Sequence, residues 1–185
     1  MGLFGNGGGF DRLIRDRHSV HNFSDKKLNI RDVLEVIDAA NQAPSAGNLH
    51  VLKFLIVEDA DKISKLTKAC QQGFINDSKL VIVVCSDVDQ VVRNFPERGV
   101  LYSRQQAGAA IQNMLLKVQH LGMATCWVGH FSEKTVRRIL KIPKHYDIEA
   151  ILPLGYELKL KAHEVKKKQP LHQSVFYDEW NNKRH

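Results

Sequence analysis

Three polar residues near the start of the chain alternate in a way that could bind an anion. In the segment RHSVHNF, single residues separate Arg17, Ser19 and His21. Because alternate side chains of an extended segment share one face, a guanidinium, a hydroxyl and an imidazole could converge there on a phosphate. The same residues could equally form a polar exit from a helix, so this segment alone leaves both interpretations open.

A second candidate lies in the segment APSAGNLHVLKF. Pro44 stops an apolar helical pattern, and Ser45, Gly47 and Asn48 follow it with hydrogen-bonding groups of little bulk. Such a loop suits the polar edge of a flat heterocycle as well as it suits a simple turn between a helix and a strand.

The segment TCWVG provides a third candidate at the end of a strand-like run. Gly129 permits a close approach of the backbone to a ligand, and Trp127 would then be an aromatic neighbour of that ligand. A tryptophan that only packs in the core would give the same pattern.

Other chemistries find little support in the sequence. It contains no GxSxG, HExxH, Walker or GxGxxG motif. The nine histidines do not fall at metal-ligand spacing. The three cysteines are an odd number without a CxxC pair, which predicts buried, reduced thiols and no metal site.

The candidate loops lie between predicted helices and strands. Apolar residues at helical spacing predict helices over residues 10–14, 29–43, 59–70, 102–122 and 132–140. The apolar stripe of the second helix consists of Ile30, Val33, Leu34, Ile37 and Ala40. Strands are expected over residues 52–59, 79–87, 123–131 and 148–156. The run 79–87 is apolar almost throughout, which predicts a central strand covered on both faces.

Length and composition indicate one globular domain. The chain has 185 residues, of which 43% are hydrophobic and 25% charged. No apolar run approaches the roughly 20 residues that a membrane helix requires. The N-terminal MGLFGNGGGF lacks the features of a secretory signal, so we expect a cytoplasmic protein with a flexible lead-in over residues 1–9.

The chain is basic, with a formal charge of +7. Much of the excess lies in KLKAHEVKKK, residues 159–168, and in the terminal NNKRH. This charge favours an anionic partner but does not distinguish nucleic acid from a phosphate-bearing cofactor, and a solvated basic tail explains it equally well.

Five segments, taken in order, resemble the nitroreductase family of FMN-dependent oxidoreductases. They are RHSVHNF, APSAGNLHVLKF, LYSRQQAGAAIQNMLLKVQHLGMATCWVGHF, ILPLGY and KKQPLHQSVFYDEW. The resemblance implies a single α+β domain with a central, mostly antiparallel sheet flanked by helices. It also implies a homodimer with two FMN sites at the interface, in which a C-terminal extension over residues 158–185 embraces the other subunit.

The resemblance further implies a set of cofactor-binding residues. Those expected to bind the FMN phosphate or to lie beside it are Arg17, His18, Ser19, His21 and Lys168. Those expected to cover the isoalloxazine ring from the opposite subunit are Pro44, Ser45, Ala46 and Asn48. Those expected to contact the ring, the last three through backbone groups near its N5–O4 edge, are Gln72, Trp127, Val128 and Gly129.

Three positions depart from the family pattern. Many relatives carry Arg or Lys at His21 and Arg at Lys168, so a weaker or pH-sensitive phosphate site is expected, since a lysine lacks the bidentate fork. Relatives often carry an acidic residue at Gln106, which bears on the choice of substrate.

The implied reaction is a ping-pong cycle. NADH or NADPH would deliver hydride to FMN N5 and leave, and a nitroaromatic, a quinone or a related small-molecule acceptor would then be reduced, with no catalytic side chain required. Two alternatives remain at this point: a basic module that binds nucleic acid, and a flavin-binding protein for storage or sensing without turnover.

Replacement of Arg17 tests the expected phosphate contact. We expect Arg17→Ala to weaken FMN binding by about 1.5–3 kcal/mol, because a charge-assisted hydrogen bond is lost. Fluorescence titration of the flavin measures this change. An unchanged FMN affinity would show that Arg17 does not contact the phosphate.

Overall fold

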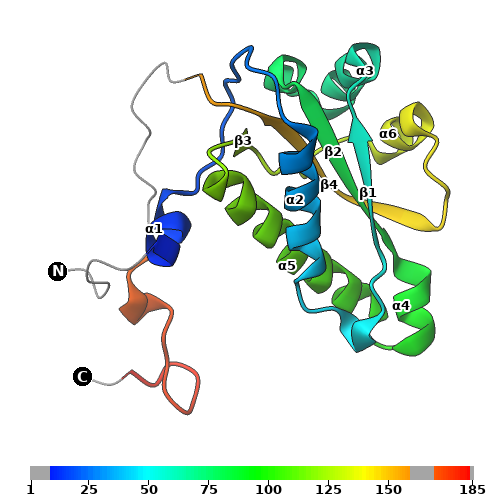
Figure 1. Ribbon diagram of the computed structural model, residues 1–185. Coiled ribbons are helices and arrows are strands. Elements are labelled where there is room, and N and C mark those ends of the chain that lie inside the picture. The colour runs from blue at the N-terminus through cyan, green and yellow to red at the C-terminus, as the bar shows by residue number, and fades with distance from the viewer. Residues whose placement is uncertain (1–8, 159–168, 184–185) are drawn as a thin grey trace.

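The fold is built around the apolar run that was expected at the centre of a sheet. The computed structural model describes residues 9–158 and 169–183 (Figure 1). Its helices are α1 (Gly9–Asp16), α2 (Ile30–Asn41), α3 (Ala60–Cys70), α4 (Val88–Asn94), α5 (Gly99–His120) and α6 (Glu133–Leu140). Its strands are β1 (Leu52–Val57), β2 (Leu80–Asp87), β3 (Ala124–Thr125) and β4 (Tyr146–Gly155).

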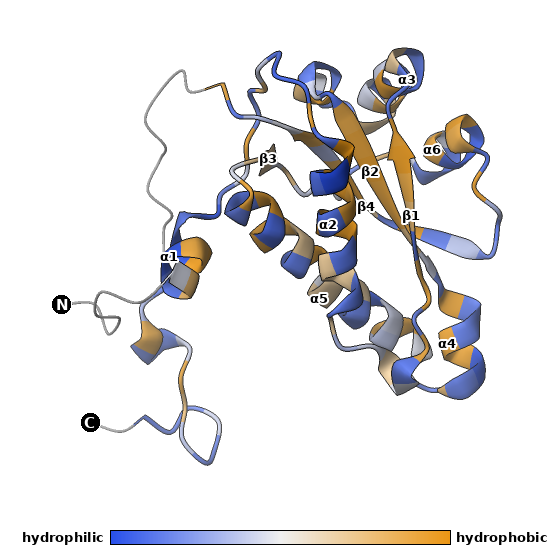
Figure 2. Cartoon of the chain, viewed as in Figure 1, coloured by the Kyte–Doolittle hydropathy of each residue, from blue (hydrophilic) through white to orange (hydrophobic). Residues whose placement is uncertain are grey.

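The four strands form one antiparallel sheet in the order β1-β2-β4-β3. β2 lies inside the sheet and is buried along nearly its whole length. Helices cover the sheet, and the strands are the most hydrophobic part of the chain (Figure 2). The predicted α+β fold with a mostly antiparallel sheet is therefore confirmed.

Alternate residues of β2 contribute to two separate cores. Ile82 and Val84 pack with α2 and α5 on one face, whereas Val81, Val83 and Cys85 pack with α3 and α6 on the other. This division follows from the two-residue period of a strand, whose successive side chains point to opposite faces.

The second helix begins where the sequence predicts. The Asn29 side chain accepts a hydrogen bond from the Arg31 amide at 3.0 Å and so caps α2. The predicted apolar stripe is only partly correct: Val33 and Ala40 are buried, but Ile30 and Leu34 are about half exposed. The apolar surface of α2 is therefore wider than the face that the helix buries within one chain.

Three further details of the structure differ from what the sequence led us to expect. The expected strand 123–131 is reduced to β3 and a single bridge between Val128 and Ile151, because the chain leaves the sheet between them. The short helix α4 was not predicted; Asp87 caps it by accepting from the Gln90 amide at 2.9 Å. The expected lead-in also extends one residue too far, since Gly9 already belongs to α1.

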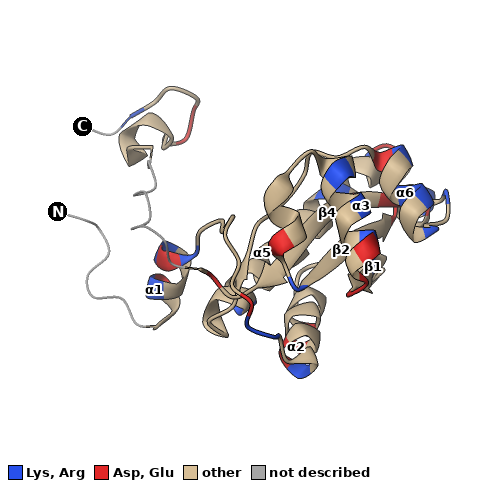
Figure 3. Ribbon diagram, turned by 90° about the horizontal axis from the view of Figure 1, so that it is seen from above, with Lys and Arg blue, Asp and Glu red and all other residues tan. Residues whose placement is uncertain are grey.

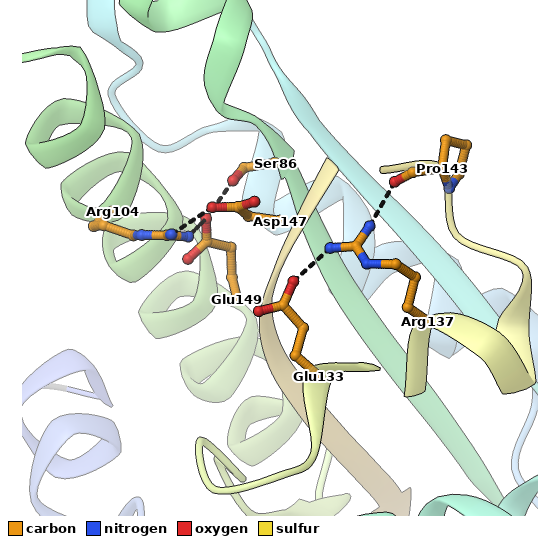
Figure 4. A network of polar contacts seen from close by, with 7 residues as sticks. All are labelled: Ser86, Arg104, Glu133, Arg137, Pro143, Asp147 and Glu149. Atoms are coloured by element: carbon orange, nitrogen blue, oxygen red, sulfur yellow. Dashed lines mark hydrogen bonds and ion pairs between the residues drawn. The ribbon is translucent and has the colours of Figure 1, made fainter. Parts of the chain in front are cut away.

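Ion pairs tie α5 to the sheet. The pairing of β2 with β4 shifts by one residue between Val84 and Cys85, which leaves Glu149 as an extra residue in β4. Arg104 of α5 contacts Glu149 and Asp147, each at 2.5 Å, and Ser86 donates to the same Glu149 (Figure 4). The bulge thus turns a carboxylate toward the helix.

The three cysteines are buried and free, as predicted. Burial raises the pKa of Cys70 to about 11 and that of Cys85 to about 12, so both thiols keep their protons at neutral pH. Among the described residues, no helix combines the length and the hydrophobicity that crossing a membrane would require.

The described part of the C-terminal tail, residues 169–183, lies apart from the sheet and its helices in two views at right angles (Figures 1 and 3). Trp180 is 82% exposed, and Leu171 is also exposed. A tail with exposed apolar side chains resembles a segment that packs on a partner.

The close approach of α4 to α5 depends on a glycine. A Cβ at Gly99 would lie 2.5 Å from Val92 Cα and 2.8 Å from its nitrogen, which are backbone atoms that cannot rotate away. We expect Gly99→Ala to lower the free energy of unfolding by about 1–3 kcal/mol, measured by urea denaturation. Gly73→Ala is the matched control, because a Cβ there meets nothing within 4 Å. Equal midpoints for the two variants would contradict this account.

Candidate cofactor site

The segment expected to bind an anion runs beside β3. The Val20 amide donates to the Thr125 carbonyl at 3.0 Å and holds the segment there. Cys126, the residue that directly follows β3, is approached from this segment: His21 Nε2 lies 3.2 Å from its Sγ, and the Ser19 hydroxyl is near enough to lower the pKa of the thiol. Ser19 and His21 therefore share one face, as expected for an extended segment.

Burial and nearby polar groups have opposite effects on the pKa of the Cys126 thiol. Burial raises the pKa of Cys126, while the bond from Ser19 and the positive charge of Arg17 act in the opposite direction. Arg17 is therefore close enough for its charge to act on Cys126. His18 is directed elsewhere: its Nδ1 lies 2.8 Å from the Asp16 carbonyl, and its Nε2 lies 3.5 Å from Glu157.

Gln72 is brought toward the same end of the sheet by its neighbour Phe74. The rings of His21 and Phe74 have centroids 4.5 Å apart. Phe74 also packs against a small core formed with Val20. Gln72 precedes it by two residues and is half-buried at the start of the turn Gly73–Asp77.

The segment after Cys126 offers only part of its backbone to a ligand. The Val128 amide donates to the Ile151 carbonyl at 3.0 Å, and its carbonyl accepts from the Ile151 amide at 3.0 Å. Among the three predicted residues, the amides that this bridge leaves to a ligand are therefore those of Trp127 and Gly129. Gly129 is exposed, and a Cβ there would approach no atom closer than Trp127 Nε1 at 3.9 Å.

The loop Pro44–Asn48 is held by the long helix. The Ala46 amide donates to Gln106 Oε1 of α5 at 3.1 Å. Gln106 is only 5% exposed, and its Nε2 has no hydrogen-bond partner among the described residues. Gln106, at which the sequence shows a departure from the family, thus positions the loop.

The loop itself has a constrained backbone. Gly47 and Asn48 both have positive φ, of 56° and 57°, and so does His50, with 45°. The Asn48 side chain contacts His50 Nε2 at 2.8 Å through Oδ1. Left-handed residues that are not glycine are strained and concentrate at ligand sites.

A hollow of about 340 Å³ opens between this loop and the α4–α5 corner. Its aromatic wall comes from Phe95 and Tyr102, and Gln106 lies at its base. The remaining lining residues are Pro44, Ser45, Ala46, Gly47, Gln105 and Ala109.

Helix α5 separates the loop from Trp127 within one chain. The loop is bound to Gln106, whereas Trp127 lies beside Gly108, with its ring 4.0 Å from the position of a Cβ there. Residues two apart on a helix point to different sides. The structure thus places Arg17 and His21 near Cys126, immediately before the predicted residues Trp127–Gly129, but it does not bring the loop to them within one chain.

A comparison with known families identifies the family of this chain. A family model described as the nitroreductase family matches residues 14–79 and 67–156, which is most of the chain. The chain belongs to the nitroreductase family. A relative in Archaeoglobus fulgidus, provisionally named NADH dehydrogenase/NAD(P)H nitroreductase, is 29% identical over 150 residues, covering 78% of this chain and 83% of the relative.

Solved nitroreductase structures share the fold. The NADPH:FMN oxidoreductase of Vibrio harveyi, determined with NAD+, superposes with a TM-score of 0.82 at 21% identity, covering 94% of this chain and 79% of that one. The FMN-dependent nitroreductase of Clostridium difficile has a TM-score of 0.77 at 20% identity, covering 91% and 98%. The predicted family is therefore confirmed.

Sequence reasoning missed two features of this region. The role of Gln106 in holding the loop was not anticipated, and neither was the contact of Cys126 with His21. The signal for Cys126 was its position inside TCWVG, beside residues already singled out. Lys168, the other expected phosphate ligand, lies outside the described residues.

Replacement of Gln106 tests its hold on the loop. In Gln106→Leu the Ala46 amide loses its acceptor, so its hydrogen exchange should accelerate about fivefold, the effect of one net hydrogen bond. Gln105→Leu is the control, because Gln105 lines the same hollow without bonding the loop amide. Amide exchange followed by NMR or mass spectrometry gives the comparison, and equal rates at Ala46 in both variants would contradict the assignment.

Proposed function

We propose that this protein is an FMN-dependent oxidoreductase that transfers hydride from NADH or NADPH to a nitroaromatic, a quinone or a related acceptor. The observation that carries the proposal is the convergence of Arg17, Ser19 and His21 beside Cys126, immediately before Trp127–Gly129. Family membership supports the enzyme class and the cofactor, which were both predicted from the sequence.

The residues present suit the cofactor. A phosphate needs cationic and hydroxyl donors in one place, and Arg17 and Ser19 supply them at the end of β3. A flat ring needs backbone donors without bulk, and the exposed Gly129 meets that need. The buried, unpartnered Gln106 Nε2 adds an amide donor at the hollow beside the loop.

When bound, FMN supplies the redox chemistry, taking hydride at N5 from NAD(P)H and passing it to the acceptor in a ping-pong cycle. In our proposal the residues of the chain bind FMN and orient it. Arg17 and Ser19 hold the phosphate with His21 beside them, and His18 supports the segment through Glu157.

The ring contacts come from other residues. We assign the N5–O4 edge to the amides of Trp127 and Gly129, since the Val128 amide is bonded within the sheet. Gln72 lies on the same side of the site and is proposed to contact the ring. Hydrogen-bond donors placed at this edge stabilise negative charge that develops on the reduced ring.

We further propose a homodimer in which the loop of one subunit serves the flavin of the other. Helix α5 separates Pro44, Ser45, Ala46 and Asn48 from Trp127 in one chain, so a second copy is the natural source of these contacts. Apolar side chains left exposed on one chain agree with an interface: Phe10, Ile14, Ile30, Leu34, Leu171 and Trp180. The tail over residues 158–185 would embrace the partner.

The two alternatives have weaker support. Basic and acidic residues are intermixed over the helices (Figure 3), and residues 159–168 hold five lysines and one glutamate, so the basic excess is not a stripe on the described body. This argues against a nucleic-acid interface. Storage of flavin without turnover is separated from catalysis by experiment. The expected cytoplasmic location agrees with a supply of NADH and NADPH.

Spectroscopy and steady-state kinetics test the proposal. The purified protein should show flavin absorption, or acquire it when FMN is added. It should then oxidise NADH or NADPH in the presence of menadione or a nitroaromatic, with parallel double-reciprocal plots as the sign of a ping-pong cycle. Protein that takes up no FMN would contradict the proposal. Protein that takes up FMN without oxidising either nucleotide would support storage instead.

A further inference from the structure

The contacts of Cys126 are unusual for a buried cysteine. Its Sγ lies 3.2 Å from His21 Nε2, a residue of the proposed phosphate-binding segment, and the hydroxyl of Ser19 in the same segment acts on the pKa of this thiol. The residue is 7% exposed. Cys85 belongs to the same apolar cluster as Cys126, but it lies in β2 and has no contact with the segment 17–22 among the hydrogen bonds of the described residues.

The contact between Cys126 and His21 indicates which group donates and which accepts at the imidazole. A buried thiol at neutral pH is protonated and is a weak donor, so it can donate to His21 Nε2. The ring proton of a neutral histidine then resides on Nδ1, which can act as a donor. Contact with Phe74, at 4.5 Å between centroids, restricts the tilt of the ring.

We propose that Cys126 is a positioning residue of the phosphate site, which orients His21 for the phosphate of FMN without contacting the cofactor itself. This inference rests on the proposed function. It ascribes to the thiol a role in discriminating FMN from riboflavin, the same flavin without the phosphate.

The separation in sequence shows why such a residue is needed. His21 and Cys126 are 105 positions apart, and the segment 17–22 belongs to no helix or strand. Its backbone is tied to the sheet by the bond of Val20 to Thr125 and, three residues further, by the bridge of Phe23 to Glu157. Side chains on such a segment need a second anchor to converge on one ligand, because each free rotamer weakens binding.

The test compares dissociation constants for FMN and riboflavin, measured by fluorescence titration of flavin-free protein. Cys126→Ala should raise the constant for FMN about fivefold, as expected for one net hydrogen bond, and leave that for riboflavin within about twofold of wild type. Cys126→Ser keeps a donor and should restore the ratio of the two constants. Cys85→Ala is the matched control, because it removes the thiol of a buried cysteine that does not contact the segment 17–22. It should leave the ratio of the two dissociation constants unchanged.

Each other outcome has a distinct meaning. An unchanged ratio in Cys126→Ala, equal weakening of both flavins, or a Cys126→Ser variant that behaves like Cys126→Ala would overturn the positioning role. Wild-type protein that binds the two flavins equally would refute the phosphate assignment on which the inference depends. Wild-type protein that binds neither flavin would refute the proposed function itself.

Discussion

The burial of β2 on both faces is the constraint on which the rest of the structure depends. A strand that is apolar along nearly its whole length cannot leave either face in water, so one layer of helices must cover each side. Helices α2 and α5 fill one face, and α3 and α6 fill the other. The long helix α5 is thereby fixed against the sheet, and its position determines what each of its sides can reach.

The proposed site follows from that placement of α5. One side of the helix holds the Pro44–Asn48 loop through Gln106, and another side lies next to Trp127. The ion pairs of Arg104 with Asp147 and Glu149 reinforce the same docking, and the bulge in β4 makes them possible by turning a carboxylate toward the helix. Partly buried pairs of this kind chiefly specify geometry, because desolvation offsets much of their attraction.

The polar part of the site is built on short, irregular segments. The residues 17–22 have no ladder of hydrogen bonds of their own and depend on bonds to β3 and to Cys126. Functional groups commonly lie on such segments at the edge of a rigid scaffold. Here the scaffold is the sheet, and the polar groups converge where β3 ends. Apolar side chains of α1 and α2 are exposed on the described chain, which agrees with the proposed dimer.

The sequence by itself determined the local features: the cap at Asn29, the end of the second helix before Pro44, the central strand and the ordered motifs that indicate the family. It did not predict the helix α4, and it assigned Ile30 and Leu34 to the same apolar stripe as the buried Val33 although they are half exposed. Only the tertiary structure decided that Ala46 meets Gln106, 60 positions away, and that His21 meets Cys126. Local periodicity records which face of an element is apolar, whereas contacts between distant segments depend on how the helices pack across the sheet.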